Sequence, residues 1–210
     1  MAKKSLESIL KLAPVVPVLV IEDVADALPL ARALVKGGLP VLEITLRTEK
    51  ALDCIRAIAS EIEGAVVGAG TVLTPDQLGE VEKLGCAFAV SPGATPILIE
   101  AAADSAVPLL PGAATASEAM VLLEHGYRFQ KFFPAEPAGG VSYLSALASP
   151  LQQIRFCPTG GITPGTASAY LALPNVITIG GSWMAPRKLL AAKDWSSVEV
   201  LSREAAQLKR

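Results

Sequence analysis

Apolar runs recur along this chain, and each is followed by a segment whose apolar residues have the spacing of an amphipathic helix. The runs are almost continuously apolar rather than alternating, which is typical of parallel strands covered on both faces. This pattern predicts eight strands, at residues 15–21, 41–46, 65–71, 87–93, 108–113, 129–135, 153–159 and 176–183.

The segments between these runs carry helix start and stop signals, such as Thr74-Pro75-Asp76 before one helix and a glycine pair after another. Eight β-α units predict an α/β fold, a single (β/α)₈ barrel over residues 1–210 with a short amphipathic helix at its N-terminus. A doubly wound open sheet is the alternative. It normally has fewer strands and a glycine-rich first turn, and residues 21–26 contain no glycine. We expect helices at residues 49–62, 95–105, 115–125 and 141–148, and from residues 23, 74, 163 and 184 onwards.

Composition narrows the classes of function. The net charge of −2 and the pI near 5.5 argue against a nucleic-acid partner. No apolar stretch reaches the roughly 18 residues of a membrane helix, so we expect no membrane partner. Cys54, Cys86 and Cys157 lack metal-type spacing and suit a reducing cytoplasm. His125 is the only histidine, which excludes a multi-histidine metal site, and Gly126 beside it predicts a helix C-terminus.

One run carries a lysine where a buried strand is expected. Lys131 lies in FQKFFPA (129–135), which contains no acidic residue. Burial of an ammonium group without a partner costs several kcal/mol. Enzymes use such desolvation to activate a lysine nucleophile. The alternative is that Lys131 lies at a strand end and extends its amine into water.

The second run supplies polar partners for this lysine. Glu43, Thr45 and Arg47 are spaced by two, so they lie on one side of a strand. A lysine, a carboxylate and a guanidinium inside one barrel predict Schiff-base chemistry on a 2-oxo acid, whose carboxylate an arginine binds bidentately. Glu43 favours the charged lysine, whereas burial and Arg47 favour the neutral amine. A structural ion pair inside the barrel is the alternative.

Two glycine pairs follow the last two strands, in TGGITP (159–164) and GGSW (180–183). Loops at these two places commonly bind phosphate in this fold, through backbone N–H groups and a helix N-terminus. Ser182 adds a hydroxyl donor, and Arg187 is the nearest cation. Glycines required only for tight turns are the alternative. The AVVGAG segment has too few glycines in the required spacing for a dinucleotide loop.

The ordered motifs LEITLRTE, VVGAGTV, AVSPG, KFFPAE, CPTGGI and IGGSW make the chain similar to the 2-keto-3-deoxy-6-phosphogluconate (KDPG) aldolase family, which also acts on 4-hydroxy-2-oxoglutarate (KHG). The resemblance covers nearly the whole chain. It implies a class I lyase that needs no metal or cofactor, forms a homotrimer and acts on a 2-keto acid phosphate. The family cleaves the gluconate substrate to pyruvate and glyceraldehyde 3-phosphate in the Entner–Doudoroff pathway.

The resemblance also implies residue roles. Lys131 would form the Schiff base and Glu43 would move protons. The residues implied in substrate binding are Arg47 and Thr71 at the carboxylate, Pro92 and Phe133 along the pocket, Thr159 at C4, and Gly160, Gly161, Gly181 and Ser182 at the phosphate.

Two positions depart from the family pattern. Gln130 stands where an apolar residue is expected, and the period of two should point it away from the barrel axis. Thr166 stands where relatives often carry asparagine.

Several rival functions remain open. They are an aldolase for the 6-phosphogalactonate isomer, a phosphosugar isomerase, and a phosphometabolite-binding barrel without Schiff-base chemistry.

Overall fold

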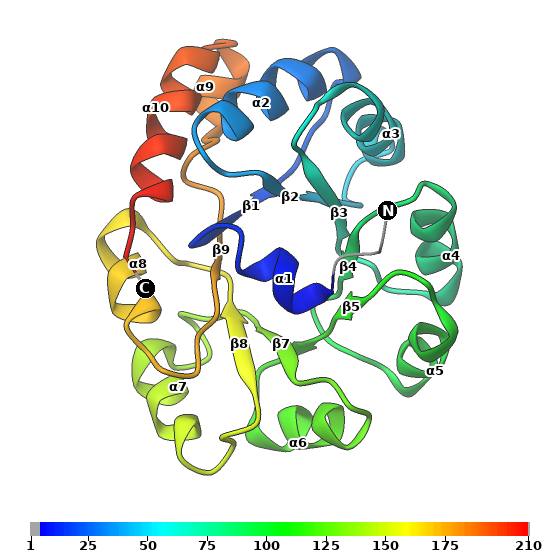
Figure 1. Cartoon of the computed structure of the whole chain (residues 1–210), viewed down its shortest axis with the longest axis vertical. Helices are drawn as coiled ribbons and strands as arrows, with labels where there is room; N and C mark the ends of the chain where they lie inside the picture. Colours follow the sequence, from blue (N-terminus) through cyan, green and yellow to red (C-terminus); the bar gives the residue numbers. More distant parts are fainter. Residues whose placement is uncertain (1–4, 210) are drawn as a thin grey trace.

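The apolar runs form parallel strands that curl into a ring, with helices packed around the outside (Figure 1). The computed structural model describes residues 5–209. The strands are β1 (Val15–Leu19), β2 (Val41–Thr45), β3 (Val66–Gly70), β4 (Phe88–Val90), β5 (Leu109–Leu110), β6 (Gly112–Ala113), β7 (Phe129–Phe132), β8 (Arg155–Pro158) and β9 (Ile179–Gly181). The helices are α1 (Leu6–Leu10), α2 (Val24–Lys36), α3 (Ala51–Glu61), α4 (Pro75–Lys83), α5 (Pro96–Asp104), α6 (Ala116–Glu124), α7 (Gly140–Ala148), α8 (Pro164–Leu171), α9 (Arg187–Ala191) and α10 (Trp195–Ala206).

The ring closes through two seams. One sheet runs in the order β5-β4-β3-β2-β1-β9 and the other in the order β6-β7-β8. The expected run 108–113 is one strand interrupted at Pro111, which has no N–H to donate to a ladder. The Pro111 carbonyl still accepts a hydrogen bond from the Lys131 N–H at 2.8 Å. A parallel bridge between Thr159 and Gly180 joins β8 to β9. The (β/α)₈ expectation is therefore confirmed.

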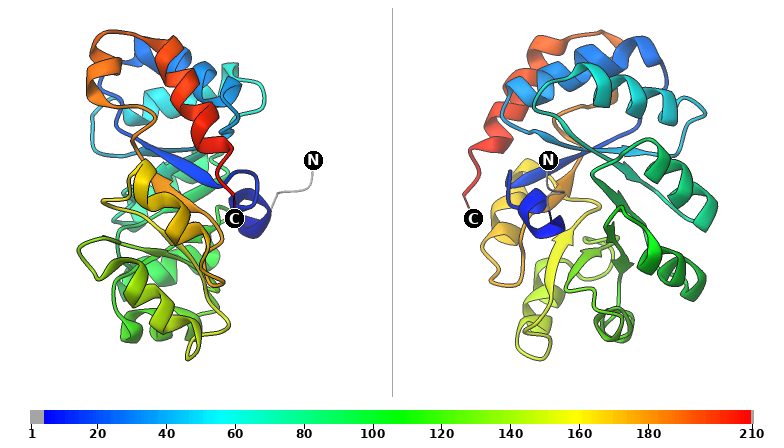
Figure 2. Two further views of the ribbon diagram at one scale, coloured as in Figure 1. Left: turned by 90° about the vertical axis from the view of Figure 1, so that its left-hand side faces the viewer. Right: turned by 45° about the vertical axis from the view of Figure 1, so that its right-hand side comes forward.

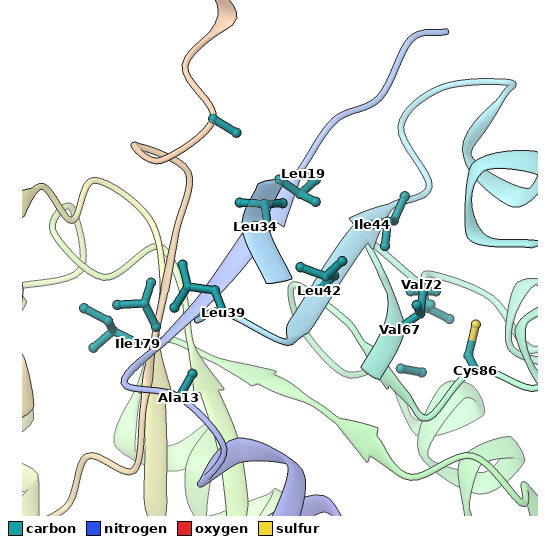
Figure 3. Packing of buried hydrophobic residues seen from close by; sticks show 14 of the residues in the cluster. Ala13, Leu19, Leu34, Leu39, Leu42, Ile44, Val67, Val72, Cys86 and Ile179 are labelled. Atoms are coloured by element: carbon teal, nitrogen blue, oxygen red, sulfur yellow. The ribbon is translucent and has the colours of Figure 1, made fainter. Parts of the chain in front are cut away.

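Side chains of the strands alternate between two cores. Outward residues of the strands pack against the helices in one cluster, in which Figure 3 shows Leu19 next to Leu34 of α2, with Leu42 and Ile44 along β2. Inward residues near the strand N-termini form a smaller cluster inside the ring, which includes Val16, Val41, Phe88 and Ile177 together with Ile9 and Leu10 of α1. The short N-terminal helix therefore seals the base of the barrel, and residues 1–4 of the predicted amphipathic segment lie outside the described residues.

Helix starts lie where the sequence predicts them. Thr74, Thr95 and Thr115 cap α4, α5 and α6 with their hydroxyl groups, and Asp23 caps α2 with its carboxylate. In β-α units these N-termini follow the carboxyl ends of the strands, so helix dipoles are directed toward the mouth of the barrel. Among residues 5–209, none of the helices has the length and hydropathy of a membrane span.

Candidate active site

The lysine and the carboxylate predicted from separate strands meet inside the barrel. Lys131 of β7 and Glu43 of β2 are both buried, each with 3% of its surface exposed. The Lys131 Nζ donates to Glu43 Oε1 at 3.2 Å. The Phe133 ring centroid lies 5.2 Å from the same Nζ, within the range of a cation–π contact. The interpretation of Lys131 as a solvent-directed strand end is therefore wrong.

Two glycines of β3 leave space for inward side chains of the neighbouring strands. Gly68 and Gly70 both occupy inward positions, since β3 runs beside β2 with Glu43 opposite Gly68. A Cβ at Gly68 would collide with the Phe88 ring, and one at Gly70 would collide with the Glu43 carboxylate. The spacing of two in AVVGAG therefore provides space beside a side chain rather than a loop for a nucleotide. This role of Gly68 and Gly70 was not predicted from the sequence, although their spacing of two places both on the inner side of β3 and could have indicated it.

A thiol lies next to the lysine. Cys157 of β8 is the register partner of Lys131 of β7 and is buried. Burial, and then the charge of Glu43, raise the pKa of the Cys157 thiol to about 12. The thiol therefore stays protonated at neutral pH and is a poor nucleophile. The amine of Lys131 is the nucleophile that this interior offers.

Arg47 and Thr71 meet at the mouth of the barrel. Arg47 lies in the turn after β2 and donates from Nε to Thr71 Oγ1 at 3.0 Å. Thr71 follows β3 and has a φ of 60°, which is rare for a residue other than glycine. Backbone strain of this kind clusters at functional sites. Arg47 is exposed, so its guanidinium can bind an anion arriving from solvent. Thr45, between Glu43 and Arg47, instead donates to the Leu19 carbonyl at 2.8 Å and joins β2 to β1.

Pro92 and Phe133 line one side of the site. They share a cavity of about 280 Å³ with Gly112 and with residues of α6. A Cβ at Gly112 would meet the backbone of Pro92, so glycine is required for this approach of β6 to the loop after β4. These two predicted pocket residues are therefore brought together, on the β4–β7 side of the lysine.

The glycine loop after β8 packs on the KFFPAE segment. Gly160 and Gly161 have positive φ values of 104° and 82°. The Gly160 carbonyl accepts from the Glu136 N–H at 3.0 Å, and the Thr159 carbonyl accepts from the Ala135 N–H at 2.8 Å. The loop leads into α8, whose N-terminal dipole favours an anion.

The second glycine loop completes this edge of the site. Thr159 is buried and its side chain occupies the space that a Cβ at Gly180 would need. Gly181 ends β9, and its missing side chain leaves space for the Trp183 ring. Ser182 is exposed and lines a second cavity, of about 530 Å³, between β1 and α9. Thr159 therefore lies between the lysine strand and the proposed phosphate loops.

The two departures from the family pattern are structural. Gln130 points away from the barrel axis as predicted, and its Nε2 donates to the carbonyls of Ala119 and Tyr127. The Thr166 hydroxyl accepts from the Thr163 N–H at 3.1 Å and forms part of the cap of α8. His125 is the C-cap of α6, with its Nδ1 2.9 Å from the Val121 carbonyl, which confirms its predicted structural role.

A buried tyrosine is a further residue that the sequence did not identify. Tyr170 of α8 is buried and donates from its hydroxyl to Glu136 Oε1 at 2.8 Å. Burial and the Glu136 carboxylate raise the pKa of Tyr170. A Cβ at Gly161 would meet the Glu136 side chain. Tyr170 therefore fixes the carboxylate of Glu136 beside the glycine loop.

Comparisons with known proteins agree with this geometry. Residues 6–201 match the family model described as KDPG and KHG aldolase. The KHG/KDPG aldolase of Escherichia coli (strain K12) is 53% identical over 205 residues, which are 98% of this chain and 96% of the relative.

Two solved structures superpose closely. KDPG aldolase from Legionella pneumophila, with pyruvate captured as a covalent carbinolamine intermediate, has a TM-score of 0.95 at 42% identity and covers 98% of this chain and 100% of its own. The Zymomonas mobilis ZM4 enzyme with 3-phosphoglycerate has a TM-score of 0.94 at 49% identity and covers 100% and 98%. The chain therefore belongs to the KDPG and KHG aldolase family.

Proposed function

We propose that this chain is a class I aldolase that cleaves 2-dehydro-3-deoxy-6-phosphogluconate to pyruvate and D-glyceraldehyde 3-phosphate. The observation that carries the proposal is the buried contact of 3.2 Å between Lys131 Nζ and Glu43 Oε1. A nucleophile with a proton-transfer partner within hydrogen-bond reach is the arrangement that Schiff-base formation requires. The carbinolamine in the Legionella pneumophila relative supports the same chemistry here.

The first half of the reaction builds an electron sink. Lys131 Nζ gives a proton to Glu43 and attacks the substrate carbonyl at C2, forming a carbinolamine. Glu43 then protonates the departing hydroxyl, water leaves, and an iminium ion joins C2 to Nζ. Dry surroundings strengthen each charge interaction in these steps, since both side chains are nearly fully buried.

The second half breaks the carbon–carbon bond. The C4 hydroxyl gives its proton to the Glu43 carboxylate, the C3–C4 bond cleaves, and its electron pair moves into the iminium to give an enamine. The aldehyde leaves as glyceraldehyde 3-phosphate. Glu43 delivers a proton to C3, and water hydrolyses the resulting iminium to pyruvate and free Lys131. Proton transfers by a positioned carboxylate contribute roughly 10²–10⁴-fold to such rates.

The ends of the substrate have matching groups in the proposed site. Arg47 with Thr71 binds the carboxylate of the pyruvyl half, and Pro92 with Phe133 lines the apolar wall beside it. Gly160, Gly161, Gly181 and Ser182 bind the phosphate through N–H and hydroxyl donors. The Zymomonas mobilis relative with 3-phosphoglycerate supports a phosphate monoester at this end.

Thr159 sets the preference for the gluconate substrate over the galactonate isomer. Its buried side chain lies between the Lys131 strand and the second glycine loop, where C4 of a bound substrate would pass. A 4-hydroxy-2-oxoglutarate substrate shares the pyruvyl half, so we expect cleavage to pyruvate and glyoxylate as a second activity. The Escherichia coli relative carries both activities in its name.

The proposal extends to assembly and compartment. Leu73, Ile97, Met120 and Val121 are large apolar side chains exposed around α4, α5 and α6, which supports a homotrimer that buries them. Light scattering checks the assembly, with a mass of three chains expected.

All three cysteines are buried and free, which supports a reducing cytoplasm.

Turnover of three substrates tests the function. Pyruvate release is followed from the gluconate substrate, its galactonate isomer and 4-hydroxy-2-oxoglutarate, with wild type and Thr159→Val compared. We expect the highest kcat/KM with the gluconate substrate, and a smaller ratio between the two isomers in Thr159→Val. Absence of pyruvate from all three would favour a phosphometabolite-binding barrel with a structural ion pair.

A further inference from the structure

A second cavity adjoins the proposed phosphate loops. It has a volume of about 530 Å³ and lies between the end of β1, the start of α2 and α9. Ser182 and Arg187 both line it, as do Glu22 and Asp26. In the left view of Figure 2, α9 (orange) lies on the opposite side of the barrel from α1 (dark blue). Since α1 seals the base, this cavity opens on the mouth side, where substrate enters.

The glycine loops contain no cation. A phosphate monoester carries nearly two negative charges at neutral pH, and TGGITP and GGSW provide only backbone N–H groups and hydroxyls. Arg187 follows GGSW within five residues and begins α9. Among residues 5–209, no carboxylate lies within 4.0 Å of its guanidinium. The guanidinium can therefore turn toward an anion at Ser182.

We propose that Arg187 is a substrate-binding residue that contacts the phosphate from the cavity side, and that it sets the preference for phosphorylated over neutral aldehydes. The inference rests on the proposed aldolase function. A guanidinium matches phosphate geometry with two parallel N–H donors. The cavity gives its long side chain room to close over the phosphate while the glycine loops hold the opposite side.

The acidic residues of the cavity sharpen this assignment. Asp26 Oδ1 already pairs with Lys193 Nζ at 3.0 Å. Glu22 lines the cavity as a second carboxylate, which would repel a phosphate if no cation faced it. Arg187 and Glu22 should therefore act on phosphate affinity in opposite directions, which a purely structural role for Arg187 would not produce.

The aldol addition of pyruvate to two acceptors tests the inference. D-glyceraldehyde 3-phosphate and D-glyceraldehyde differ only in the phosphate. For Arg187→Ala we expect KM for the phosphorylated acceptor to rise by at least about tenfold, since the charge-assisted hydrogen bonds of the guanidinium to the phosphate are lost. We expect kcat within about twofold and unchanged kinetics with D-glyceraldehyde. For the phosphorylated acceptor, the KM of Arg187→Lys should lie between those of wild type and Arg187→Ala. Glu22→Gln should lower this KM below the wild-type value.

Lys188→Ala is the matched control, because Lys188 is the next cation on α9 and does not line the cavity. Calorimetric titration of 3-phosphoglycerate into Lys131→Ala protein, with and without Arg187→Ala, measures phosphate binding without turnover. An equal change in KM for both acceptors, or no change in either KM or Kd, would overturn the proposed role of Arg187 and leave the aldolase function standing. Wild-type protein that joins neither acceptor to pyruvate would overturn the aldolase function itself.

Discussion

The two ends of the barrel interior are built from the same strands but differ in their inward side chains, which are apolar at the base and charged above it. At the base, inward positions hold Val41 of β2 and Phe129 of β7, which contribute to the apolar cluster sealed by α1. Two residues further along each strand, the inward positions hold Glu43 and Lys131, which form the buried ion pair. A step of two residues along each strand therefore leads from the apolar cluster, which stabilises the fold, to the ion pair of the proposed active site.

The difference shows what each end requires of its neighbours. The base is filled by packing, for example by the Phe88 ring over Gly68. The upper layer keeps space, because Gly70 leaves room for the Glu43 carboxylate. Burial at the base contributes roughly 25 cal/mol per Å² of apolar surface, whereas burial of the ion pair carries a desolvation cost. Substitutions at the two ends should therefore separate activity from stability.

Removal of the nucleophile should have the largest effect on activity. For Lys131→Ala we expect kcat to fall by at least about a thousandfold, since Lys131 is the only buried lysine among residues 5–209 that could form the iminium. Far-UV circular dichroism should show an intact fold. Lys83→Ala, which removes an exposed lysine of α4, is the control and should keep wild-type turnover. Wild-type turnover in purified Lys131→Ala would contradict the mechanism.

Replacement of the proton carrier should have the next largest effect. Glu43→Gln keeps the shape of the side chain and a hydrogen bond to Lys131 but cannot carry a proton. We expect kcat to fall about 10²–10⁴-fold. NMR of pyruvate in D₂O gives a direct readout, because enamine formation exchanges its methyl protons. Exchange at the wild-type rate in Glu43→Gln would show that another group moves the proton.

Filling the space beside the carboxylate should have an intermediate effect. The methyl group of Gly70→Ala would meet Glu43 and displace its carboxylate from Lys131. Since a misplacement of about 1 Å can cost up to about a hundredfold in rate, we expect kcat to fall ten- to a hundredfold. Gly79→Ala is the control, because nothing lies within 4 Å of the added Cβ on α4. Equal kinetics in both variants would exclude a positioning role for Gly70.

Truncation at the base should have the smallest effect on activity. Phe88 is fully buried in the lower cluster, and Phe88→Ala should destabilise the fold by about 3–5 kcal/mol. At 25 °C we expect kcat within about twofold of wild type, because the ion pair lies in the layer above. Urea unfolding and steady-state kinetics measure the two quantities. A fall in kcat that matched Gly70→Ala would show that the two layers are coupled.

Much of the fold follows from local pattern. The apolar runs predict the strands because parallel strands are buried on both faces, and Thr74, Thr95 and Thr115 predict helix starts through their hydroxyl caps. Inward polar residues such as Glu43 and Lys131 are predictable because an ionisable group inside a barrel needs a partner or a function.

Other features depend on contacts across the ring. Period two places a residue on the inner side of its strand, but the 3.2 Å contact between Lys131 and Glu43 depends on the stagger of strands 88 residues apart. The role of Gly70 follows from the neighbouring strand rather than from its own segment. The interruption at Pro111 likewise depends on the pairing of its neighbours, because β5 before it belongs to one sheet and β6 after it belongs to the other.

Covalent trapping tests the central claim most directly. Protein is incubated with pyruvate and sodium borohydride, and its intact mass and peptide map are then measured. The account predicts one reduced pyruvate adduct per chain, on the peptide that contains Lys131, and none in Lys131→Ala. An adduct on a different lysine, or none in wild-type protein, would contradict the Schiff-base role of Lys131.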